Sequence, residues 1–263
     1  MDSLFIIHHS SVLNFFMKKN FILSGALILS AFNAFAQEDL TKPQTTEVWE
    51  PQPKIVTPAA DNAAAPSDAI VLFDGKSFAE WETLKGNAVE WKLKDGAMTV
   101  AGGKGNIKTK KTFGDCQLHV EWRSPMEPDS LKGQAKGNSG VFFQQRYEIQ
   151  VLNNYQNKTY ANGQATAVYK QHIPLANACR KPGEWQTYDI VFTAPRFRKN
   201  GSLERPAYVT VMHNGIITQN HVELQGTTEY IGTPQYKMHG NAPIELQDHG
   251  NAVSYRNIWI REL

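Results

Sequence analysis

Alternation of apolar and polar residues is the feature that most restricts what this chain can fold into. In the segment CQLHVEWR, residues 116–123, every even position is apolar and every odd position is polar. Residues 146–151 and 244–249 alternate in a similar way, and β-rich alternating segments occupy residues 185–194 and 252–263. Successive side chains of a β-strand point to opposite faces, so this pattern predicts strands with one buried face.

Two dipeptides predict tight hairpins between such strands. Asp95-Gly96 and Asn214-Gly215 each separate two β-rich runs. Both residue pairs suit a type I′ turn, because both of its central residues need a positive φ. After residue 68 we find no convincing amphipathic helix of ten or more residues. The pattern therefore predicts an all-β fold, either a β-sandwich or a jelly roll.

The N-terminal segment has the features of a secretory signal. Lys18 and Lys19 precede an apolar run from Phe21 to Phe32, and the small-residue motif Ala34-Phe35-Ala36 follows. This order is typical of a cleaved signal peptide, and the run is too short to span a bilayer. We predict a signal peptide over 1–36, in which 1–16 is an upstream extension. The mature chain is then secreted or periplasmic, without a membrane span.

Composition divides the remainder of the chain into two parts. Residues 37–68 are rich in Pro, Ala and Thr and lack apolar periodicity, which predicts an extended linker. Residues 69–263 have a globular composition and a length that suits one all-β domain.

Charge and cysteine content exclude some classes of function. The whole chain carries a formal net charge of +2, and removal of residues 1–36 takes away Lys18, Lys19 and Asp2. A nearly neutral chain gives no indication of nucleic-acid binding, which usually needs a basic face. Cys116 and Cys179 are in no metal-binding motif. In an oxidising compartment they could pair, although two separate buried thiols are the commoner arrangement.

The polar faces of three predicted strands carry groups that could form a site. An antiparallel sheet often exposes one face to solvent, and that is the simplest explanation of each face alone. These faces, however, combine planar amides, guanidinium groups and carboxylates with nearby aromatic residues. Such groups bind sugar hydroxyls and stack on pyranose rings. The residues concerned are Glu121, Arg123, Asn138, Arg146, Glu148, Gln150, Tyr169, Trp185, Tyr188, Gln247 and His249.

The candidate acid–base groups do not form the pair that a conventional glycosidase needs. Glu148, Glu121, Asp248 and His249 are the candidates. Glycosidases use two carboxyl groups about 5–5.5 Å or roughly 6.5–9.5 Å apart. The residue two positions after Glu148 is Gln150 rather than a carboxylate, although Glu121 or Asp248 could complete a pair from a neighbouring strand. Motifs of serine hydrolases, zinc proteases and nucleotide-binding proteins are absent.

Long ordered segments resemble the 3-keto-disaccharide hydrolase family, and the resemblance covers essentially all of residues 69–263. Members of this family are also described as 3-keto-glucoside 1,2-lyases and 3-keto-2-hydroxyglucal hydratases. The segments are AIVLFDGKSFAEWE (69–82), GNIKTKKTFGDCQLHVEWRSP (105–125), GNSGVFFQQRYEIQVLN (137–153), NGQATAVYKQHIPLANACRKPGEWQTYDIVFTAPRF (162–197), VTVMHNGIITQNHVEL (209–224) and PIELQDHGNAVSYRNIWIREL (243–263).

The resemblance implies a concanavalin A-like lectin/glucanase jelly roll in which the three polar faces share one sugar-binding sheet. It also implies a chemistry that needs no carboxylate pair. A partner sugar 3-dehydrogenase first makes a 3-ketone, the ketone acidifies the C2 hydrogen, and elimination then expels the C1 substituent. Water adds to the resulting enone. No redox cofactor is needed on this chain.

The resemblance leads to a set of expected roles. Glu148 or His249 acts as base or acid, and Arg146 and Arg123 stabilise enolate charge. The remaining expected roles are hydroxyl binding by Gln150, Asn138, Glu121 and Gln247, and stacking by Trp185, Tyr188 or Tyr169. A divalent metal at Glu148, Glu121 or His249 is an alternative electrophile. Arg146 and Glu148 could also form only a cross-strand ion pair.

Two other functions remain open from the sequence. The first is a non-catalytic carbohydrate-binding lectin, because fold alone does not fix activity. The second is a conventional glycoside hydrolase.

Overall fold

The computed structural model describes residues 41–61 and 63–263 of the chain. The chain divides into two compact units, Met1–Pro53 and Lys54–Leu263. The described part of the first unit contains the 3-10 helix η1 (Pro43–Thr46). The predicted signal segment, 1–36, lies outside the described residues, as does the start of the predicted linker.

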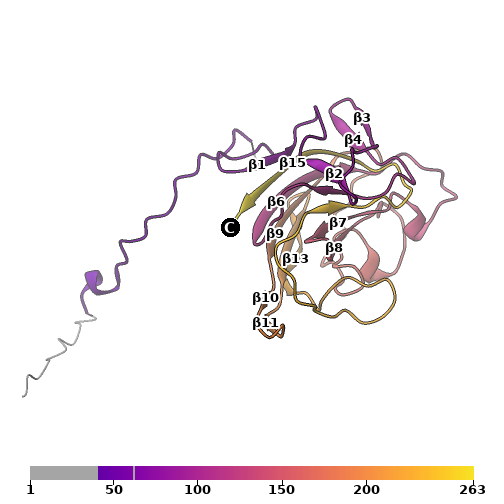
Figure 1. Cartoon of the computed structure of the whole chain (residues 1–263). Coiled ribbons are helices and arrows are strands. Elements are labelled where there is room, and N and C mark those ends of the chain that lie inside the picture. The colour runs from indigo at the N-terminus through magenta and orange to yellow at the C-terminus, as the bar shows by residue number, and fades with distance from the viewer. Residues whose placement is uncertain (1–40, 62) are drawn as a thin grey trace, which may run out of the picture. The chain divides into compact units, whose positions relative to one another are not determined.

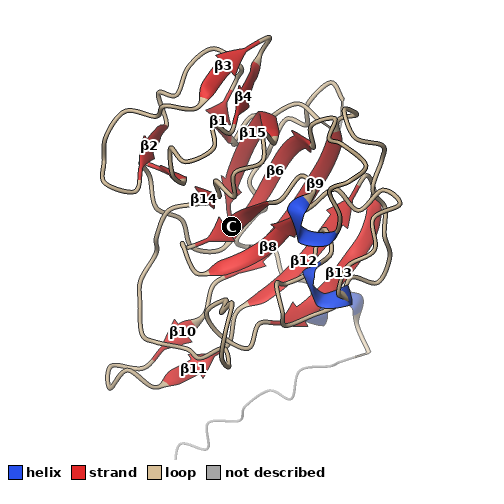
Figure 2. Cartoon of the chain, turned by 90° about the vertical axis from the view of Figure 1, so that its right-hand side faces the viewer, coloured by secondary structure: helices blue, strands red, loops and turns tan. Residues whose placement is uncertain are grey.

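Antiparallel sheets make up the second unit (Figures 1 and 2). The larger sheet has eight strands in the order β13-β12-β9-β6-β15-β4-β3, with β1 paired to β15. The smaller sheet has five strands in the order β2-β5-β14-β7-β8, and β10 pairs with β11 separately.

The strand bounds agree with an all-β chain of short segments. The larger sheet consists of β1 (Ile70–Phe73), β3 (Lys92–Lys94), β4 (Ala97–Thr99), β6 (Cys116–Arg123), β9 (Gln186–Thr193), β12 (Tyr208–His213), β13 (Ile216–Glu223) and β15 (Ser254–Glu262). The smaller sheet consists of β2 (Trp81–Thr83), β5 (Ile107–Thr109), β7 (Ser139–Phe143), β8 (Tyr147–Val151) and β14 (Glu245–Leu246). The separate ribbon consists of β10 (Arg196–Phe197) and β11 (Leu203–Arg205).

Helical structure is limited to short 3-10 turns in the described residues. They are η1, η2 (Gly133–Ala135) and η3 (Ala161–Gly163). Across those same residues, no helix has the length and apolar character that a membrane span requires.

Both predicted hairpins are confirmed. Asp95 and Gly96 have φ values of 52° and 73° between β3 and β4. Asn214 and Gly215 have φ values of 51° and 81° between β12 and β13. Positive φ at both central residues is the signature of the type I′ turn, whose twist matches that of the flanking strands.

The apolar faces of the two sheets form one shared core. Leu118, Val120 and Trp122 of β6 belong to the same buried cluster as Tyr147 and Ile149 of β8. The two sheets therefore pack face to face, as in a β-sandwich. The polar residues between these positions point to the outer faces. Alternation sorted the two faces of each strand correctly, because the buried layer takes every second side chain.

The expectation that the three polar faces share one sheet is wrong. Strand β6 lies in the larger sheet, whereas β8 and β14 lie in the smaller one. Since the two polar faces point away from the common core, Glu121 lies on one outer face and Glu148 on the other. Alternation within a strand carries no information about which sheet the strand joins, and the sequence pattern could not separate them.

Two further predictions concern residues in the core. Tyr188, expected as a stacking wall, is fully buried, and its hydroxyl donates to the main-chain oxygen of Gln150 at 2.9 Å. It therefore links β9 to β8 across the core instead of facing a ligand. Cys116 and Cys179 are separate free thiols, the first of them buried.

The last part of the predicted linker contacts the outer face of the larger sheet. The carbonyl oxygen of Ala63 accepts hydrogen bonds from Asn257 Nδ2 at 2.8 Å and Trp259 Nε1 at 2.9 Å. Asp68 accepts two hydrogen bonds from Arg261. These contacts hold the chain over β15 before the first strand begins.

Replacement of Gly215 by Ala tests how much the type I′ turn contributes to stability. A Cβ at Gly215 would meet no atom within 4 Å, so the cost comes from the positive φ alone. We expect the free energy of unfolding to fall by about 1 kcal/mol or more, measured by chemical denaturation. Gly240→Ala is the matched control, because its Cβ also meets nothing and its φ is ordinary. Equal losses in both variants would contradict the role of the turn.

Candidate active site

A cavity of about 550 Å³ opens on the outer face of the smaller sheet. Its floor comes from β7, β8 and the residues after β14, and loops around residues 134, 160–170 and 228–230 form its walls. Its lining residues are Gln134, Asn138, Phe142, Glu148, Gln150, Tyr160, Tyr169, Lys170, Thr228, Tyr230, Gln247 and His249. Five of the residues predicted to bind or react with a ligand thus line one cavity together with Glu148.

Glu148 is a buried carboxyl group in the floor of this cavity. Its exposed fraction is 5%, and among the described residues no side chain or main-chain N–H bonds its carboxyl oxygens. Its main chain is fixed on both sides: its N–H donates to Thr228 Oγ1 at 3.0 Å, and its carbonyl accepts from Tyr169 N–H at 3.2 Å. Burial first, and then the nearby carboxylate of Glu245, raise the pKa of Glu148 to about 8.

Gly140 provides the space that the Glu148 side chain occupies. It lies on β7 opposite Gln150. A Cβ at this position would lie 2.6 Å from Glu148 Oε1 and 2.8 Å from a ring carbon of Phe142. The absence of a side chain at Gly140 therefore lets the carboxyl group lie across the neighbouring strand, at the floor of the cavity.

Amide side chains form the rest of the floor. Gln150 Nε2 donates to Asn138 Oδ1 at 2.9 Å, and Asn138 Nδ2 donates to the carbonyl of Gln134 at 2.8 Å. Gln134 is fixed in turn by its bond to the carbonyl of Gly163 at 2.9 Å. The Oε1 of Gln247 is buried and has no partner in the described part of the chain. An unpaired buried acceptor is costly, so a donor brought to this oxygen would stabilise it.

Three tyrosines and a lysine form the rim. The hydroxyls of Tyr160 and Tyr169 are 2.7 Å apart. Lys170 Nζ donates to the carbonyl of Tyr230 at 2.5 Å and lies 4.2 Å from the centre of that ring. Sequence reasoning found Tyr169 but missed Tyr160, Lys170, Thr228 and Tyr230. These residues lie on loops, where no strand periodicity reports the direction of a side chain.

His249 is the second titratable group that could exchange a proton in this cavity. It is exposed and lies in the segment that follows β14, two residues after Gln247, and both residues line the cavity. Its neighbour Asp248 is committed to the turn, since its carboxylate accepts from the N–H groups of Gly105 and Gly250, each at 2.9 Å. Glu148 and His249 are therefore brought together by the fold, and Asp248 is not.

Arg146 lies outside this cavity. Its guanidinium donates to the carbonyl of Gln144 at 2.8 Å, and it lines a different surface hollow with Thr227 and Glu229. It forms no ion pair with Glu148 among the described residues. The bend that Gln144 and Gln145 make between β7 and β8, both with positive φ, turns Arg146 away from the face that carries Glu148.

Glu121 lies on the outer face of the larger sheet and is fully engaged there. It accepts from Arg256 Nε at 2.5 Å and from Asn257 Nδ2 at 2.9 Å. Burial alone would raise its pKa, but His119, 3.9 Å away, and the hydrogen bonds from Asn257 and Arg256 outweigh burial and lower the pKa to about 2. His119 also contacts Asp189 at 2.7 Å. This carboxylate stabilises a network and has no free oxygen directed at a ligand.

Arg123 and Trp185 belong to the same outer face. The guanidinium carbons of Arg123 and Arg256 lie 4.6 Å and 4.2 Å from the Trp185 ring centre. The indole thus makes cation–π contacts with two arginines, which occupy the surface that a sugar would need for stacking. Of the predicted site residues, these two and Glu121 lie far from the Glu148 cavity, across the core.

The described residues offer no cluster of three or more His, Cys, Asp or Glu side chains suited to a metal ion. Of the three predicted ligands, Glu148 and His249 line one cavity, whereas Glu121 lies across the core. Glu148, with only one histidine beside it, does not provide the usual donor set of a resident divalent ion.

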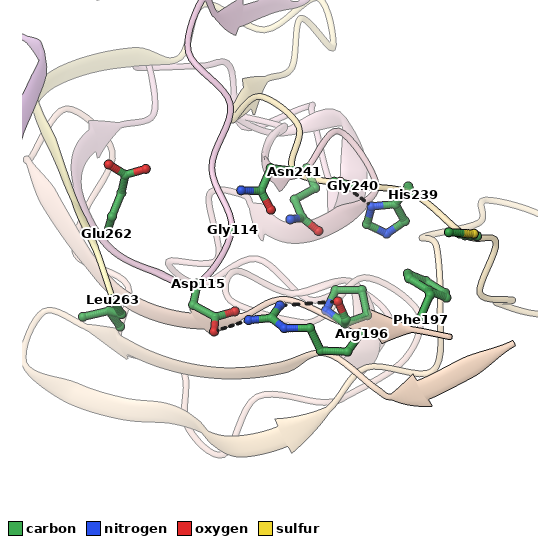
Figure 3. A pocket seen from close by; sticks show the side chains of 12 residues that line it. Gly114, Asp115, Arg196, Phe197, His239, Gly240, Asn241, Glu262 and Leu263 are labelled. Atoms are coloured by element: carbon green, nitrogen blue, oxygen red, sulfur yellow. Dashed lines mark hydrogen bonds and ion pairs between the residues drawn. The ribbon is translucent and has the colours of Figure 1, made fainter. Parts of the chain in front are cut away.

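A second cavity, of about 420 Å³, lies where Gly114, Phe197 and the segment around His239 meet (Figure 3). Its charged side chains are already paired: Arg196 donates to Asp115 at 2.6 Å, and Lys111 donates to Glu262 at 2.7 Å. Both ring nitrogens of His239 are bonded, one to Gly240 and the other to Tyr147. Burial lowers the pKa of His239. This cavity therefore lacks a free acid–base group, and the Glu148 cavity is the candidate active site.

Comparison with known families agrees with this geometry. A family model described as the 3-keto-alpha-glucoside-1,2-lyase-like domain matches residues 68–261. The chain belongs to this family. The match begins one residue before the predicted domain and includes every residue of the candidate site. No curated protein matches the sequence.

Solved structures support a carbohydrate-active enzyme. A protein from Parabacteroides distasonis ATCC 8503, described as a candidate glycosyl hydrolase, is 52% identical with a TM-score of 0.81. That similarity covers 84% of this chain and 97% of the other. A second structure with the same description and organism is 20% identical, with a TM-score of 0.54 over 74% of this chain and 94% of the other, and it supports the fold alone.

Glu148→Gln should stabilise the fold, and the gain should grow with pH. The pKa of this carboxyl has its ordinary value of 4.5 in the unfolded chain, and burial raises it to about 8 in the folded protein. The wild-type protein therefore loses stability as pH rises from 4.5 to 8, because only the unfolded state releases this proton readily. We expect a gain on the order of 2–4 kcal/mol at pH 8 and little at pH 4. Urea denaturation at both pH values measures it, and a pH-independent gain would contradict the burial of this group.

Proposed function

We propose that this chain cleaves the glycosidic bond of 3-keto-glycosides by elimination across C1 and C2, followed by hydration. The observation that carries the proposal is the Glu148 carboxyl group, which is buried in a cavity of amides and tyrosines and receives no hydrogen bond from the described residues. Family membership supports the reaction class. We also propose that the fold is a concanavalin A-like jelly roll and that the chain is exported to the periplasm or beyond.

A 3-ketone changes what the enzyme must supply. The ketone makes the C2 hydrogen acidic, so one base and one proton donor suffice, together with donors for the developing enolate oxygen. We assign the acid–base roles to Glu148 and His249. The reaction needs no redox group on this chain, and a separate sugar 3-dehydrogenase must form the ketone first.

The remaining cavity residues fit the recognition of a sugar. Gln247, with its unpaired Oε1, and the amides of Asn138 and Gln150 can bind hydroxyl groups. Tyr169, Tyr160 and Tyr230 provide rings for stacking at the rim. The sequence suggested Arg146 and Arg123 for enolate stabilisation. In this proposal the floor amides take that role, because neither arginine reaches the cavity.

A conventional glycoside hydrolase is the second candidate, favoured by one observation. Glu245 is a second carboxylate on the same face of the smaller sheet as Glu148. It does not line the cavity, however, and both of its oxygens accept hydrogen bonds from amides, Asn106 at 2.6 Å and Gln145 at 3.1 Å. A two-carboxylate mechanism needs both groups at the scissile bond.

Incubation of the pure protein with a 3-keto-glucoside and with its unoxidised parent separates the candidates. We expect cleavage of the keto sugar alone, with deuterium from D2O incorporated at C2. Cleavage of the parent would support the conventional hydrolase, and binding of either sugar without turnover would support a lectin.

Glu148→Gln and His249→Ala test the assignment of the acid–base groups. Each should lower kcat/KM for the 3-keto-glucoside by about 100-fold or more, because a positioned acid or base contributes this much. Glu204→Gln, at an exposed position of β11 in the separate ribbon, is the control. Full activity in both site variants would show that the cavity is not the active site.

Gly140→Ala tests the position of the Glu148 carboxyl. The added methyl group overlaps Glu148 Oε1, and it must displace the carboxyl from the floor. We expect at least a ~10-fold loss of kcat with a smaller change in KM, because a misplaced group affects the transition state first. Activity equal to that of the wild type would mean that the carboxyl does not act from this position.

A further inference from the structure

Glu245 and Glu148 flank the same residue on one face of the smaller sheet. Glu245 of β14 pairs with Phe142 of β7, and Phe142 pairs with Glu148 of β8. The three side chains therefore project from adjacent strands to the same side, with Phe142 in the middle. Two strand spacings separate the glutamate backbones by about 10 Å. Sequence reasoning missed this pair because residues about 100 positions apart become neighbours only through strand order.

The environments of the two carboxyl groups are opposite. Glu245 is 7% exposed, and each of its oxygens accepts from an amide N–H, of Asn106 and of Gln145. Each oxygen of this carboxylate therefore has a hydrogen-bond partner. Lys108, its neighbour in register, lies 3.5 Å from Glu82 instead. Glu148 receives no such donor among the described residues. Burial and this fixed negative charge both oppose its ionisation, in agreement with a pKa of about 8.

The other charged groups around Glu148 do not reverse this effect. Lys170 and His249 line the cavity, and both are exposed to solvent, which screens their charge. Lys170 is moreover directed to the carbonyl and ring of Tyr230. The phenols of Tyr169 and, from the core side, Tyr255 add no positive charge, and burial raises the pKa of each.

We propose that Glu245 is a positioning residue that keeps Glu148 in its acid form, so that Glu148 donates the proton to the leaving oxygen and His249 is the base. This inference rests on the proposed function for its catalytic part. The lining of the cavity alone does not show which of Glu148 and His249 is the acid and which is the base, and the position of Glu245 distinguishes them.

The proton balance closes over one turnover. In the elimination, His249 takes the C2 proton, the C2–H electron pair forms the C1–C2 double bond, and the C1–O bond breaks. Glu148 gives its proton to the departing oxygen, which leaves as an alcohol. In the hydration, the Glu148 carboxylate takes a proton from water while the water oxygen attacks C1. Protonated His249 then returns a proton to C2. Both residues end in their starting forms.

The direct test does not depend on any substrate. Carbon-detected NMR of 13C-labelled glutamates, assigned through Glu148→Gln, gives the titration of Glu148 in the full chain. We expect a pKa well above the ordinary range, and a decrease of about one unit or more in Glu245→Gln. An ordinary value in the wild-type protein, or the same raised value in Glu245→Gln, would overturn the inference and leave the proposed function untouched.

The pH profile of kcat/KM for a 3-keto-glucoside gives the second readout. If Glu148 is the acid, kcat/KM should fall at alkaline pH as Glu148 ionises. Glu245→Gln should shift this alkaline limb to lower pH by the same amount as the change in the Glu148 pKa that NMR measures. Glu245→Asp, which keeps the charge, should restore the limb, and Glu204→Gln, at an exposed position of β11, should leave it unchanged. A uniform loss of activity without a shift would show a purely structural role for Glu245. Absence of turnover in the wild type would overturn the proposed function, and the NMR result would still decide the electrostatic claim.

Discussion

The apolar layer between the two sheets is the constraint on which the rest of this structure depends. Phe143 of β7 stacks on Phe192 of β9 with ring centres 4.7 Å apart, and Tyr147 of β8 contacts the same ring at 5.8 Å. Burial of these side chains sets the direction of the residues next to them in the same strand. A shift of the strand register by one residue would move every side chain to the opposite face. Burial of Tyr147 and Ile149 is what places Glu148 on the outer face, over the cavity floor.

Tyr188 shows how closely core and site are coupled. Its hydroxyl crosses from β9 to the main-chain oxygen of Gln150, at the strand that carries Glu148. The same strand is fixed at its outer edge by Thr228 and Tyr169. With its backbone held on both sides, β8 can carry a carboxyl group whose burial is unfavourable. The fold thus tolerates a local cost at the position where a proton must be exchanged.

Glu121 of β6 and Glu148 of β8 show that residue type alone does not determine the role of a carboxyl group. Glu121 and Glu148 both lie on polar faces and are both buried, yet their pKa values move in opposite directions. Glu121 meets Arg256, Asn257 and His119, and it is a stable anion. Glu148 meets Gly140 and no donor among the described residues. The sequence identified both as candidates, and only their neighbours in space distinguish a structural carboxylate from a reactive one.

The sequence by itself determined the strands, the hairpins and the sorting of their faces, because these follow from local alternation and from turns that require positive φ. It also determined the family, and it selected Glu148, His249, Asn138, Gln150, Tyr169 and Gln247, which the fold brings into one cavity. The tertiary structure decided which sheet each strand joins. It thereby removed Glu121, Arg123 and Trp185 from the candidate site, and it set Glu245 beside Glu148. Strand order arises from contacts between distant segments, and no periodicity within a strand records it.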